Sequence, residues 1–415
     1  MPRHALVVLC AALLAGEAIP VLADEPEPGT KPYDPVVVRA DIVYSHPSIE
    51  SLTPSVVRAG NGDLIVSMST RGDGMPSRSV AMNFVRSSDR GKTWSKPYLT
   101  SRTDKPLTGL GESLQQLPAG RLLRYSLELV WPGEPDMSRP DYFSLAGGRK
   151  FDSYYSISED NGYTFSKRRR LSDPVKRDDF AQGNIVELPN GPEGSHGDLI
   201  WSWGSWGAKP LNGFRRSTDG GRRWGHVVRA FQDPPPGHAT PLAFNETAVA
   251  VCRDATVVAI ARVDGCPPDN DKRFWLIRSH DSGQTWTVPR QIPIMGGSPA
   301  LYCAPTGQLW LAYRDGGLGP GLGLAVSDDN GETWRFLYHL KEPKGNHERL
   351  YGHIRYTAED RKQPWRPAEG QVGYPCFAKL SDREVYVVFH AASYPSALTC
   401  YIAGNLLQVA DPISK

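Results

Sequence analysis

The sequence predicts an all-β fold, a six-bladed β-propeller with four antiparallel strands in each blade. Two observations carry this prediction: an eight-residue motif that occurs five times, and six β-hairpins, five of which precede a copy of the motif. The chain has 415 residues, 40% of them hydrophobic, with 41 Gly and 36 Pro. This composition is typical of a globular protein with a buried core and many tight turns.

The repeated motif has Ser first, Asp two residues later, Gly four later and an aromatic residue seven later. Its first copy is SSDRGKTW, and the five copies span residues 87–94, 158–165, 217–224, 279–286 and 327–334. Thr precedes the aromatic residue in four copies, and Arg223 replaces it in the third. In such a turn Asp and Ser can bond backbone amides, Gly permits a positive φ, and the aromatic residue can pack between strands. The copies start 71, 59, 62 and 48 residues apart, which fits propeller blades with loops of variable length.

Each motif follows two apolar segments joined by a turn, which predicts a β-hairpin. The first hairpin is TPSVVRAGNGDLIVSMST, and the sixth, YPCFAKLSDREVYVVFHAA, has no motif after it. We expect each hairpin to supply the two inner strands of a blade, with the motif in the turn between the outer two. The segments LTCYIAGNLLQVA and VVVRADIVY would complete the last blade, join the two chain ends and remove an open sheet edge.

The chain begins with the features of a cleavable signal peptide over residues 1–23: Arg3, an apolar stretch and a small-residue site ending at Ala23. Residues 24–35 are expected to form a Pro-rich linker, and residues 36–415 the propeller. We therefore expect a secreted or periplasmic protein with no membrane span after cleavage, with an N-terminal anchor as the alternative. Five cysteines would remain, so at least one thiol is unpaired and the pairing stays open: Cys252, Cys266, Cys303, Cys376 and Cys400. The net charge of +2 does not indicate nucleic-acid binding, and no CxxC or HExxH spacing indicates a metal.

Propeller topology predicts which residues meet around the central channel. The start of each innermost strand and the end of the strand paired with it lie on one face. The expected starts are Leu52, Thr53, Glu112, Gly183, Asn184, Asn245, Glu246, Ser298 and Tyr374. The expected ends are Arg71, Leu127, Glu128, Trp203, Trp206, Arg262, Arg314 and His390. Polar and aromatic groups gathered on a rigid scaffold indicate a binding or catalytic site, whereas the motifs lie at the opposite end.

Five such motifs on six hairpins resemble the Asp-box sialidases and their relatives, over about residues 36–415. In that family three arginines hold the substrate carboxylate, a tyrosine attacks the anomeric carbon, a glutamate takes its proton and an aspartate serves as acid/base. A neutral phenol activated by a base avoids the repulsion between an anionic substrate and a carboxylate nucleophile. The resemblance implies an exo-sialidase that needs no cofactor and acts on a sialoglycoconjugate or another acidic oligosaccharide.

Four residues match the family pattern. Glu246, in FNET, matches the glutamate, and Arg262, 16 residues later, matches the second arginine. Tyr374, in VGYPCFAKL, stands where the nucleophile opens the last blade, and Arg314, in LAYRDGG, can be the third arginine. Each also has a structural interpretation: a buried tyrosine, a Glu–Arg ion pair and an arginine in a turn.

The first arginine of the family is missing, because residues 52–54 are Leu, Thr and Pro. Arg71, at the end of the adjoining strand, could reach the same pocket. Asp73 lies where the family acid/base lies, although GDG is equally a surface turn. His390 replaces a supporting glutamate and could contact substrate or transfer protons, or it could be an ordinary core histidine.

Two further residues complete the expected substrate-binding set. Glu112 adds negative charge to the ring, and Trp206, with Trp201 and Trp203, offers stacking faces unless WSWGSW belongs to the core. Two other functions therefore stay open beside the sialidase. One is a glycosidase or lyase acting on another acidic, uronate-containing polysaccharide, and the other is a carbohydrate-binding propeller without chemistry.

Overall fold

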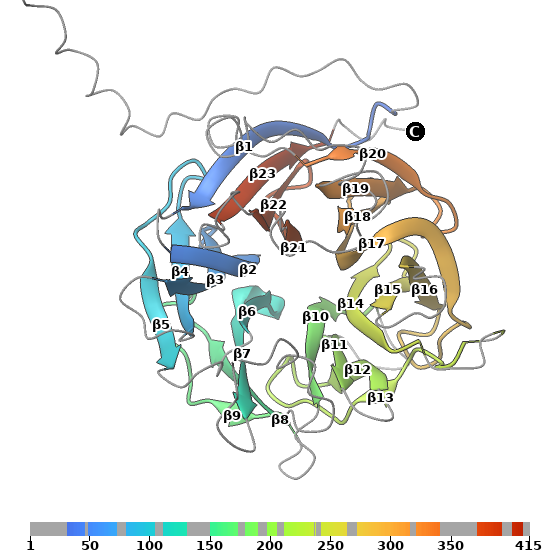
Figure 1. Ribbon diagram of the computed structural model, residues 1–415, viewed down its shortest axis with the longest axis horizontal. Helices are drawn as coiled ribbons and strands as arrows, with labels where there is room; N and C mark the ends of the chain where they lie inside the picture. Colours follow the sequence, from blue (N-terminus) through green and yellow to red (C-terminus); the bar gives the residue numbers. More distant parts are fainter. Residues whose placement is uncertain are drawn as a thin grey trace, which may run out of the picture.

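The computed structural model describes residues 31–45, 49–72, 80–103, 111–130, 150–172, 179–189, 197–205, 211–235, 237, 242–263, 272–315, 321–340, 372–391 and 401–409. In these ranges every regular element is a β-strand, apart from one short 3-10 helix, η1 (Pro118–Gly120). The strands form blades that stand in a ring around a central axis, with one strand of each blade nearest the centre (Figure 1). The predicted all-β propeller is confirmed.

Each blade is a sheet of antiparallel strands that follow one another from the centre outwards. The strands of blades 1, 2 and 3 are β2 (Ile49–Arg58), β3 (Leu64–Gly72), β4 (Val80–Ser87), β5 (Tyr98–Thr103); β6 (Gly111–Gln116), β7 (Leu122–Val130), β8 (Lys150–Ser158), β9 (Arg169–Arg170); and β10 (Asp179–Glu187), β11 (Leu199–Ser205), β12 (Leu211–Ser217), β13 (Val228–Arg229). The strands of blades 4, 5 and 6 are β14 (Phe244–Val251), β15 (Val257–Val263), β16 (Arg273–Ser279), β17 (Arg290–Cys303); β18 (Leu309–Asp315), β19 (Leu322–Ser327), β20 (Arg335–His339); and β21 (Gly373–Lys379), β22 (Glu384–Ala391), β23 (Tyr401–Gln408), β1 (Val36–Tyr44).

Strand β17 belongs to two blades. Its first part pairs with β16 as the outer strand of blade 4, and its second part pairs with β18 as the inner strand of blade 5. These two blades therefore form one continuous seven-stranded sheet beside four sheets of four strands. With β17 counted in both, the ring has six blades.

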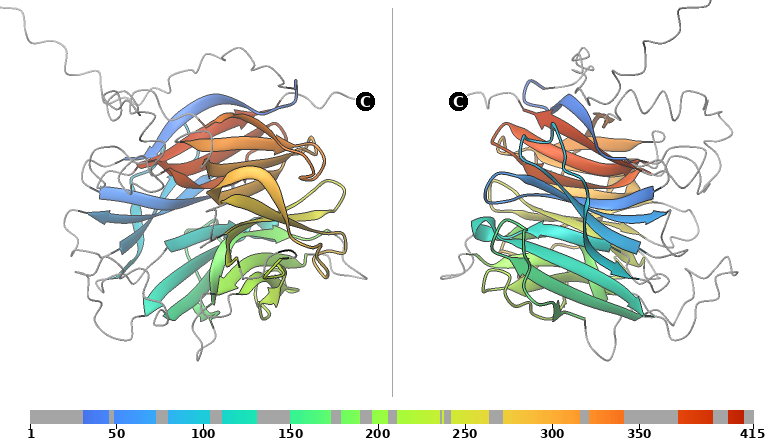
Figure 2. Two further views of the ribbon diagram at one scale, coloured as in Figure 1. Left: turned by 45° about the vertical axis from the view of Figure 1, so that its right-hand side comes forward. Right: turned by 90° about the vertical axis from the view of Figure 1, so that its left-hand side faces the viewer.

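The last blade is closed by the N-terminal part of the chain. Strand β1 pairs antiparallel with β23, from Val36 opposite Gln408 to Tyr44 opposite Ile402. The order β1-β23-β22-β21 makes β1 the outermost strand, as predicted, and Figure 2 shows β1 (blue) lying outside β23 (red). The two ends of the propeller are thus held by one backbone ladder.

Six hydrophobic clusters form the described core, one at each contact between neighbouring blades. The cluster between blades 2 and 3, for example, packs Tyr125 against Trp201, with ring centroids 5.3 Å apart. Trp201 and Trp203 are both 0% exposed. These two tryptophans are therefore core residues, and the expectation that they offer stacking faces to a sugar is wrong.

The five motifs occupy the turns between the outer two strands of blades 1 to 5. In the first copy Gly91 N–H donates to Ser87 Oγ at 2.8 Å, and Thr93 N–H donates to Asp89 Oδ1 at 2.9 Å. In the third copy the backbone N–H of Arg223 still donates to Asp219 at 2.8 Å, so the turn survives the loss of Thr. All five aromatic residues pack against interblade clusters, which makes the motif a structural fastener: Trp94, Phe165, Trp224, Trp286 and Trp334.

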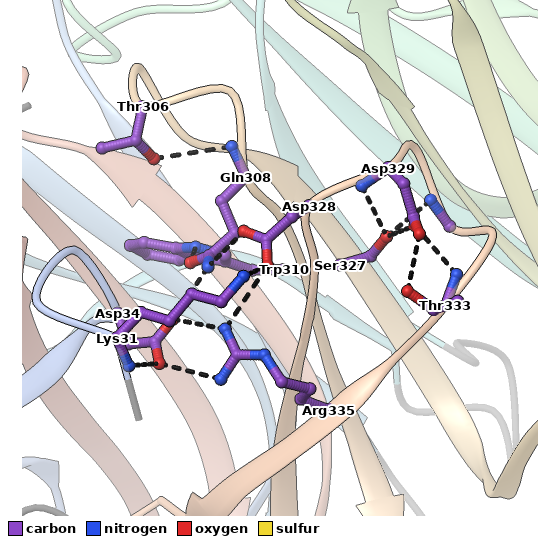
Figure 3. Close-up of polar contacts among 11 residues, drawn as sticks. Lys31, Asp34, Thr306, Gln308, Trp310, Ser327, Asp328, Asp329, Thr333 and Arg335 are labelled. Atoms are coloured by element: carbon purple, nitrogen blue, oxygen red, sulfur yellow. Dashed lines mark hydrogen bonds and ion pairs between the residues drawn. The ribbon is translucent and has the colours of Figure 1, made fainter. Parts of the chain in front are cut away.

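Residues 31–35 differ from the expected linker, because they form a turn that docks on blade 5. The carboxylate of Asp34 accepts two hydrogen bonds from Arg335, at 2.9 and 2.8 Å, and one from Gln308 at 2.8 Å. Lys31 Nζ lies 2.7 Å from Asp328 of the neighbouring motif turn. Figure 3 shows Lys31 and Asp34 beside Asp328 and Arg335. The segment before β1 therefore joins blade 5 to the strand that closes blade 6.

Replacing Asp34 with Ala is expected to lower the free energy of unfolding by about 3 kcal/mol, because a buried charge partner is lost. Burial alone would raise the pKa of Asp34, but the bonds from Arg335, Lys31 and Gln308 outweigh it and lower the pKa. A lowered folded pKa gives its full stabilisation above the unfolded value, about 3.9, and this contribution is lost progressively as the pH falls to and through the folded pKa, which lies lower. Chemical denaturation over a series from pH 7 to pH 2 should therefore show the largest difference between the two proteins at pH 7 and a smaller one at each step below about pH 4.

The matched control is Asp328→Ala in the same cluster. Asp328 is 31% exposed and its partner Lys31 is 41% exposed, so its loss should cost less than about 1 kcal/mol. Equal losses for the two variants would contradict the assignment of Asp34 as the anchor.

Candidate functional site

A cavity of about 600 Å³ opens at the centre of the ring. Its walls come from the inner strands of all six blades, and it includes Thr53, Glu246, Arg262, Ser298 and Tyr374. Within this described lining, the charged side chains are Glu246 and Arg262; most of the rest are hydroxyl, amide or apolar groups. The cavity therefore lies where the topology predicted a site.

Four inner strands carry a residue with positive φ at equivalent places: Thr53 (46°), Glu246 (41°), Ser298 (48°) and Tyr374 (52°). At each of them the antiparallel register shifts, so an extra residue bulges from the ladder. A non-glycine residue in this region carries strain of about 1–3 kcal/mol and is common at functional sites. These bulges aim four side chains at the cavity.

The Glu246 carboxylate contacts three other residues of the site. Its Oε2 accepts hydrogen bonds from the backbone N–H of Ser298 at 2.9 Å and from the Ser298 hydroxyl at 3.2 Å. Arg262 Nε lies 3.1 Å from the same oxygen. The other oxygen, Oε1, accepts a hydrogen bond from the Tyr374 hydroxyl at 3.0 Å. One oxygen is thus held by two hydrogen bonds from Ser298 and by the charge of Arg262, and the other is left for the tyrosine.

Tyr374 is 37% exposed, so its ring reaches the cavity. The negative charge of Glu246 raises the pKa of Tyr374, and burial adds to the effect. The phenol therefore stays protonated at ordinary pH, with its proton directed at a carboxylate that can accept it. This arrangement can deliver a phenolate oxygen only while Glu246 takes the proton.

Arg314 and His390 lie beside Tyr374. Arg314 Nε donates to the Val372 carbonyl at 2.7 Å, and its guanidinium lies 5.9 Å from the centre of the Tyr374 ring. The His390 ring packs on the Tyr374 ring at 5.7 Å and is 2% exposed. Burial lowers the pKa of His390 to about 3, with a further contribution from the charge of Arg314. His390 is therefore neutral at ordinary pH and does not line the described cavity, and its predicted contact with substrate stays a prediction.

A network of side-chain amides holds the backbone next to Glu246. Asn245 Oδ1 accepts from the Glu246 N–H at 2.8 Å and from Gln182 Nε2 at 2.9 Å. Asn212, which is 3% exposed, donates to Gln182 at 2.8 Å and to Thr247 Oγ1 at 2.8 Å. The strained conformation of Glu246 is thus supported by residues of blades 3 and 4.

Sequence reasoning named Ser298 and Asn245 as strand starts but missed their contacts with Glu246. One signal was present: Thr53, Ser298 and Tyr374 are each followed by proline. Proline has no N–H for the ladder and is confined to edges, strand starts and bulges. Three such pairs at matching places in three hairpins indicate the bulges.

Of the residues in the segment that lacks the family's first arginine, Thr53 lies in the cavity wall. Its hydroxyl lies 3.0 Å from the Ser69 hydroxyl. The backbones of Arg71 and Glu112 lie in β3 and β6, as predicted, and their roles stay predictions. Asp73 and Trp206 lie outside the described residues.

The described ranges offer no metal site and no membrane-spanning helix. No group of three or more His, Cys, Asp and Glu side chains is placed there to hold a metal. Nor does any helix in those ranges have the length and apolar character that crossing a membrane requires. The predicted signal peptide, residues 1–23, lies outside the described residues.

Solved structures similar to this chain are propellers of several activities. A crystal structure of a protein of unknown function from Dyadobacter fermentans has a TM-score of 0.67 and 19% identity, and the match covers 91% of this chain and 99% of that one. The leech intramolecular trans-sialidase, complexed with 2,7-anhydro-Neu5Ac, has a TM-score of 0.58 and 14% identity over 90% of this chain and 70% of its own. The α-L-arabinanase of Penicillium chrysogenum, complexed with arabinobiose, has a TM-score of 0.56 and 15% identity, with 90% and 98% covered. At these identities the likeness concerns the fold.

The sequence itself was also compared with protein families and with curated proteins. No curated protein matches it at a significant level. A family model described as a BNR repeat-like domain matches residues 143–387, which is more than half of the chain. This chain therefore belongs to the BNR repeat-like domain family.

Proposed function

We propose that the protein is an exported glycoside hydrolase of the sialidase type, which releases a terminal acidic sugar from a glycan. The observation that carries the proposal is the hydrogen bond of 3.0 Å from Tyr374 to Glu246 at the wall of the central cavity. A phenol paired with a carboxylate base suits an anionic sugar better than a carboxylate nucleophile does. The leech trans-sialidase, which has the same fold, is consistent with sialic acid as the first candidate.

The proposed reaction has two displacements. Tyr374 Oη forms a bond to the anomeric carbon while its proton passes to Glu246 Oε1 and the glycosidic C–O bond breaks. The leaving oxygen takes a proton from an acid, for which Asp73 is the candidate by resemblance. Water then gives a proton to the deprotonated acid and displaces the tyrosine, whose oxygen takes its proton back from Glu246, so the configuration at the anomeric carbon is retained. Arg262 is the candidate to hold the sugar carboxylate, and Arg314 and Arg71 are candidates to assist it.

A second candidate is a glycosidase that acts on a different sugar. The described cavity wall pairs its one carboxylate with its one arginine and is otherwise uncharged, which favours a hydroxyl-rich ring over a strongly anionic one. Hydrogen bonds from amide side chains such as Gln182 suit sugar hydroxyls. The arabinanase fold of Penicillium chrysogenum is consistent with this candidate.

A panel of aryl glycosides distinguishes the candidates. The panel contains an α-sialoside, uronides, a rhamnoside and an α-L-arabinofuranoside, assayed from pH 4 to pH 8. The first proposal expects release from the sialoside, and turnover of another member instead would assign the second. An acidic polysaccharide that gains ultraviolet absorbance would indicate a lyase. Binding to a glycan array without any turnover would contradict hydrolysis and favour a binding protein.

A further inference from the structure

The innermost strands of blades 4 and 5 meet at two places. Strands β14 and β17 pack side by side near the centre of the ring (Figure 1). At the end nearer the site, Ser298 of β17 donates to Glu246 of β14. At the other end, Cys252 directly follows β14 and Cys303 is the last residue of β17.

The two thiols are held close together by well-fixed backbone. The N–H of Cys252 donates to the Thr256 carbonyl at 2.7 Å, and the N–H of Ala304 donates to the Gln308 carbonyl at 2.8 Å, so both turns are closed. The side chains of Cys252 and Cys303 both pack in the cluster between blades 4 and 5, at the matching ends of two neighbouring strands. Both are free thiols in the structure.

The two thiols differ in how far a small reagent in solution can reach them. Cys252 is 4% exposed, whereas Cys303 is half-buried and lines the central cavity. The Cys252 thiol beside it lowers the pKa of the Cys303 thiol, and the N–H of Arg253 adds to this effect. The thiol that a small reagent can reach is therefore also the more nucleophilic one.

We infer that Cys252 and Cys303 form a reversible disulfide that ties blade 4 to blade 5 when the protein meets a low-molecular-weight disulfide such as oxidised glutathione. The Cys303 thiolate attacks one sulfur of the reagent, which gives a mixed disulfide and releases one thiolate. The sulfur of Cys252 then attacks Cys303 Sγ and releases the second thiolate. Two protein thiols are oxidised, one reagent disulfide is reduced to two thiols, and the two cysteine protons go to the released thiolates.

To test this inference, the reduced full-length chain is treated with oxidised glutathione, and the remaining thiols are then alkylated. Peptide mapping by mass spectrometry identifies the modified cysteines. The wild type is expected to lose two alkylatable thiols and to yield a peptide that joins Cys252 to Cys303, with no retained glutathione. Its Tm should rise by roughly 3 °C, because the disulfide constrains the unfolded chain. In Cys252→Ser the second step is blocked, so glutathione should stay attached to Cys303.

Cys376 provides the matched control, since it lines the same cavity without a neighbouring thiol among the described residues. Its Sγ bonds the backbone of Val56, and burial raises its pKa to about 11. Cys376→Ser should form the Cys252–Cys303 peptide as the wild type does. A stable glutathione adduct on wild-type Cys303, or a disulfide from Cys303 to any other cysteine, would overturn the inference.

Discussion

Replacing Tyr374 with Phe is expected to lower kcat by roughly 1000-fold or more on whichever glycoside the wild type hydrolyses best. The change removes only the phenolic oxygen, which is the atom that Glu246 contacts at 3.0 Å and the proposed nucleophile. The aromatic ring remains, so its packing on His390 is preserved and Tm should change little. Steady-state kinetics and thermal unfolding on the same preparation check both statements.

Tyr302→Phe is the matched control for this prediction. Tyr302 also lines the cavity, but its buried hydroxyl has no hydrogen-bond partner among the described residues. Its kcat should stay within about twofold of the wild type. If Tyr374→Phe retained activity comparable to Tyr302→Phe, a tyrosine nucleophile would be ruled out.

The place of the site could be predicted because a propeller fixes which strand ends meet. Six hairpins, five of them followed by the motif, indicated the number of blades. The opposite directions of the two strands in each hairpin then placed Glu246, Arg262 and Tyr374 on one face. The closure of blade 6 by β1 followed from the same argument, since six hairpins without it would leave an open edge.

Details of the site could not be predicted, because they depend on contacts between blades that are distant in sequence. Ser298 reaches Glu246 from 52 residues away, and the amide network reaches Asn245 from Gln182, 63 residues away. The docking of Asp34 on Arg335 spans 301 residues and depends on a turn that composition alone suggested was a linker. Sequence spacing carries no information on such pairs unless the register of every blade is already known.

The burial of Trp201 and Trp203 shows a second limit. A WSWGSW segment at a strand end is consistent with both a sugar-stacking face and a core. The structure resolves the alternatives because Arg215 covers one face of Trp203 at 4.3 Å and Tyr125 packs edge-on against both rings.

Replacing Glu246 with Gln is expected to lower kcat by roughly 100-fold to 1000-fold, because a positioned base commonly contributes that much. The amide keeps the size of the side chain, and its oxygen can still accept from Ser298. Its NH₂ group would face the Tyr374 hydroxyl, which donates to Oε1 in the wild type, and cannot take up that proton. Kinetics on the same substrate, with binding of that substrate measured by calorimetry, check the change.

The same variant separates catalysis from a structural role for the Glu246–Arg262 ion pair. If Glu246 is the base, kcat should fall while substrate binding and Tm stay near the wild-type values, since the amide preserves the shape of the side chain and its hydrogen bond from Ser298. If the Glu246–Arg262 ion pair is only structural, the variant should have a lower Tm, and its folded fraction should have the wild-type kcat. Glu384→Gln is the control, because that carboxylate pairs with Arg90 and lies in blade 6 away from the described cavity lining. Its kcat should equal that of the wild type, and an equal loss in both variants would mean that Glu246 acts only through stability.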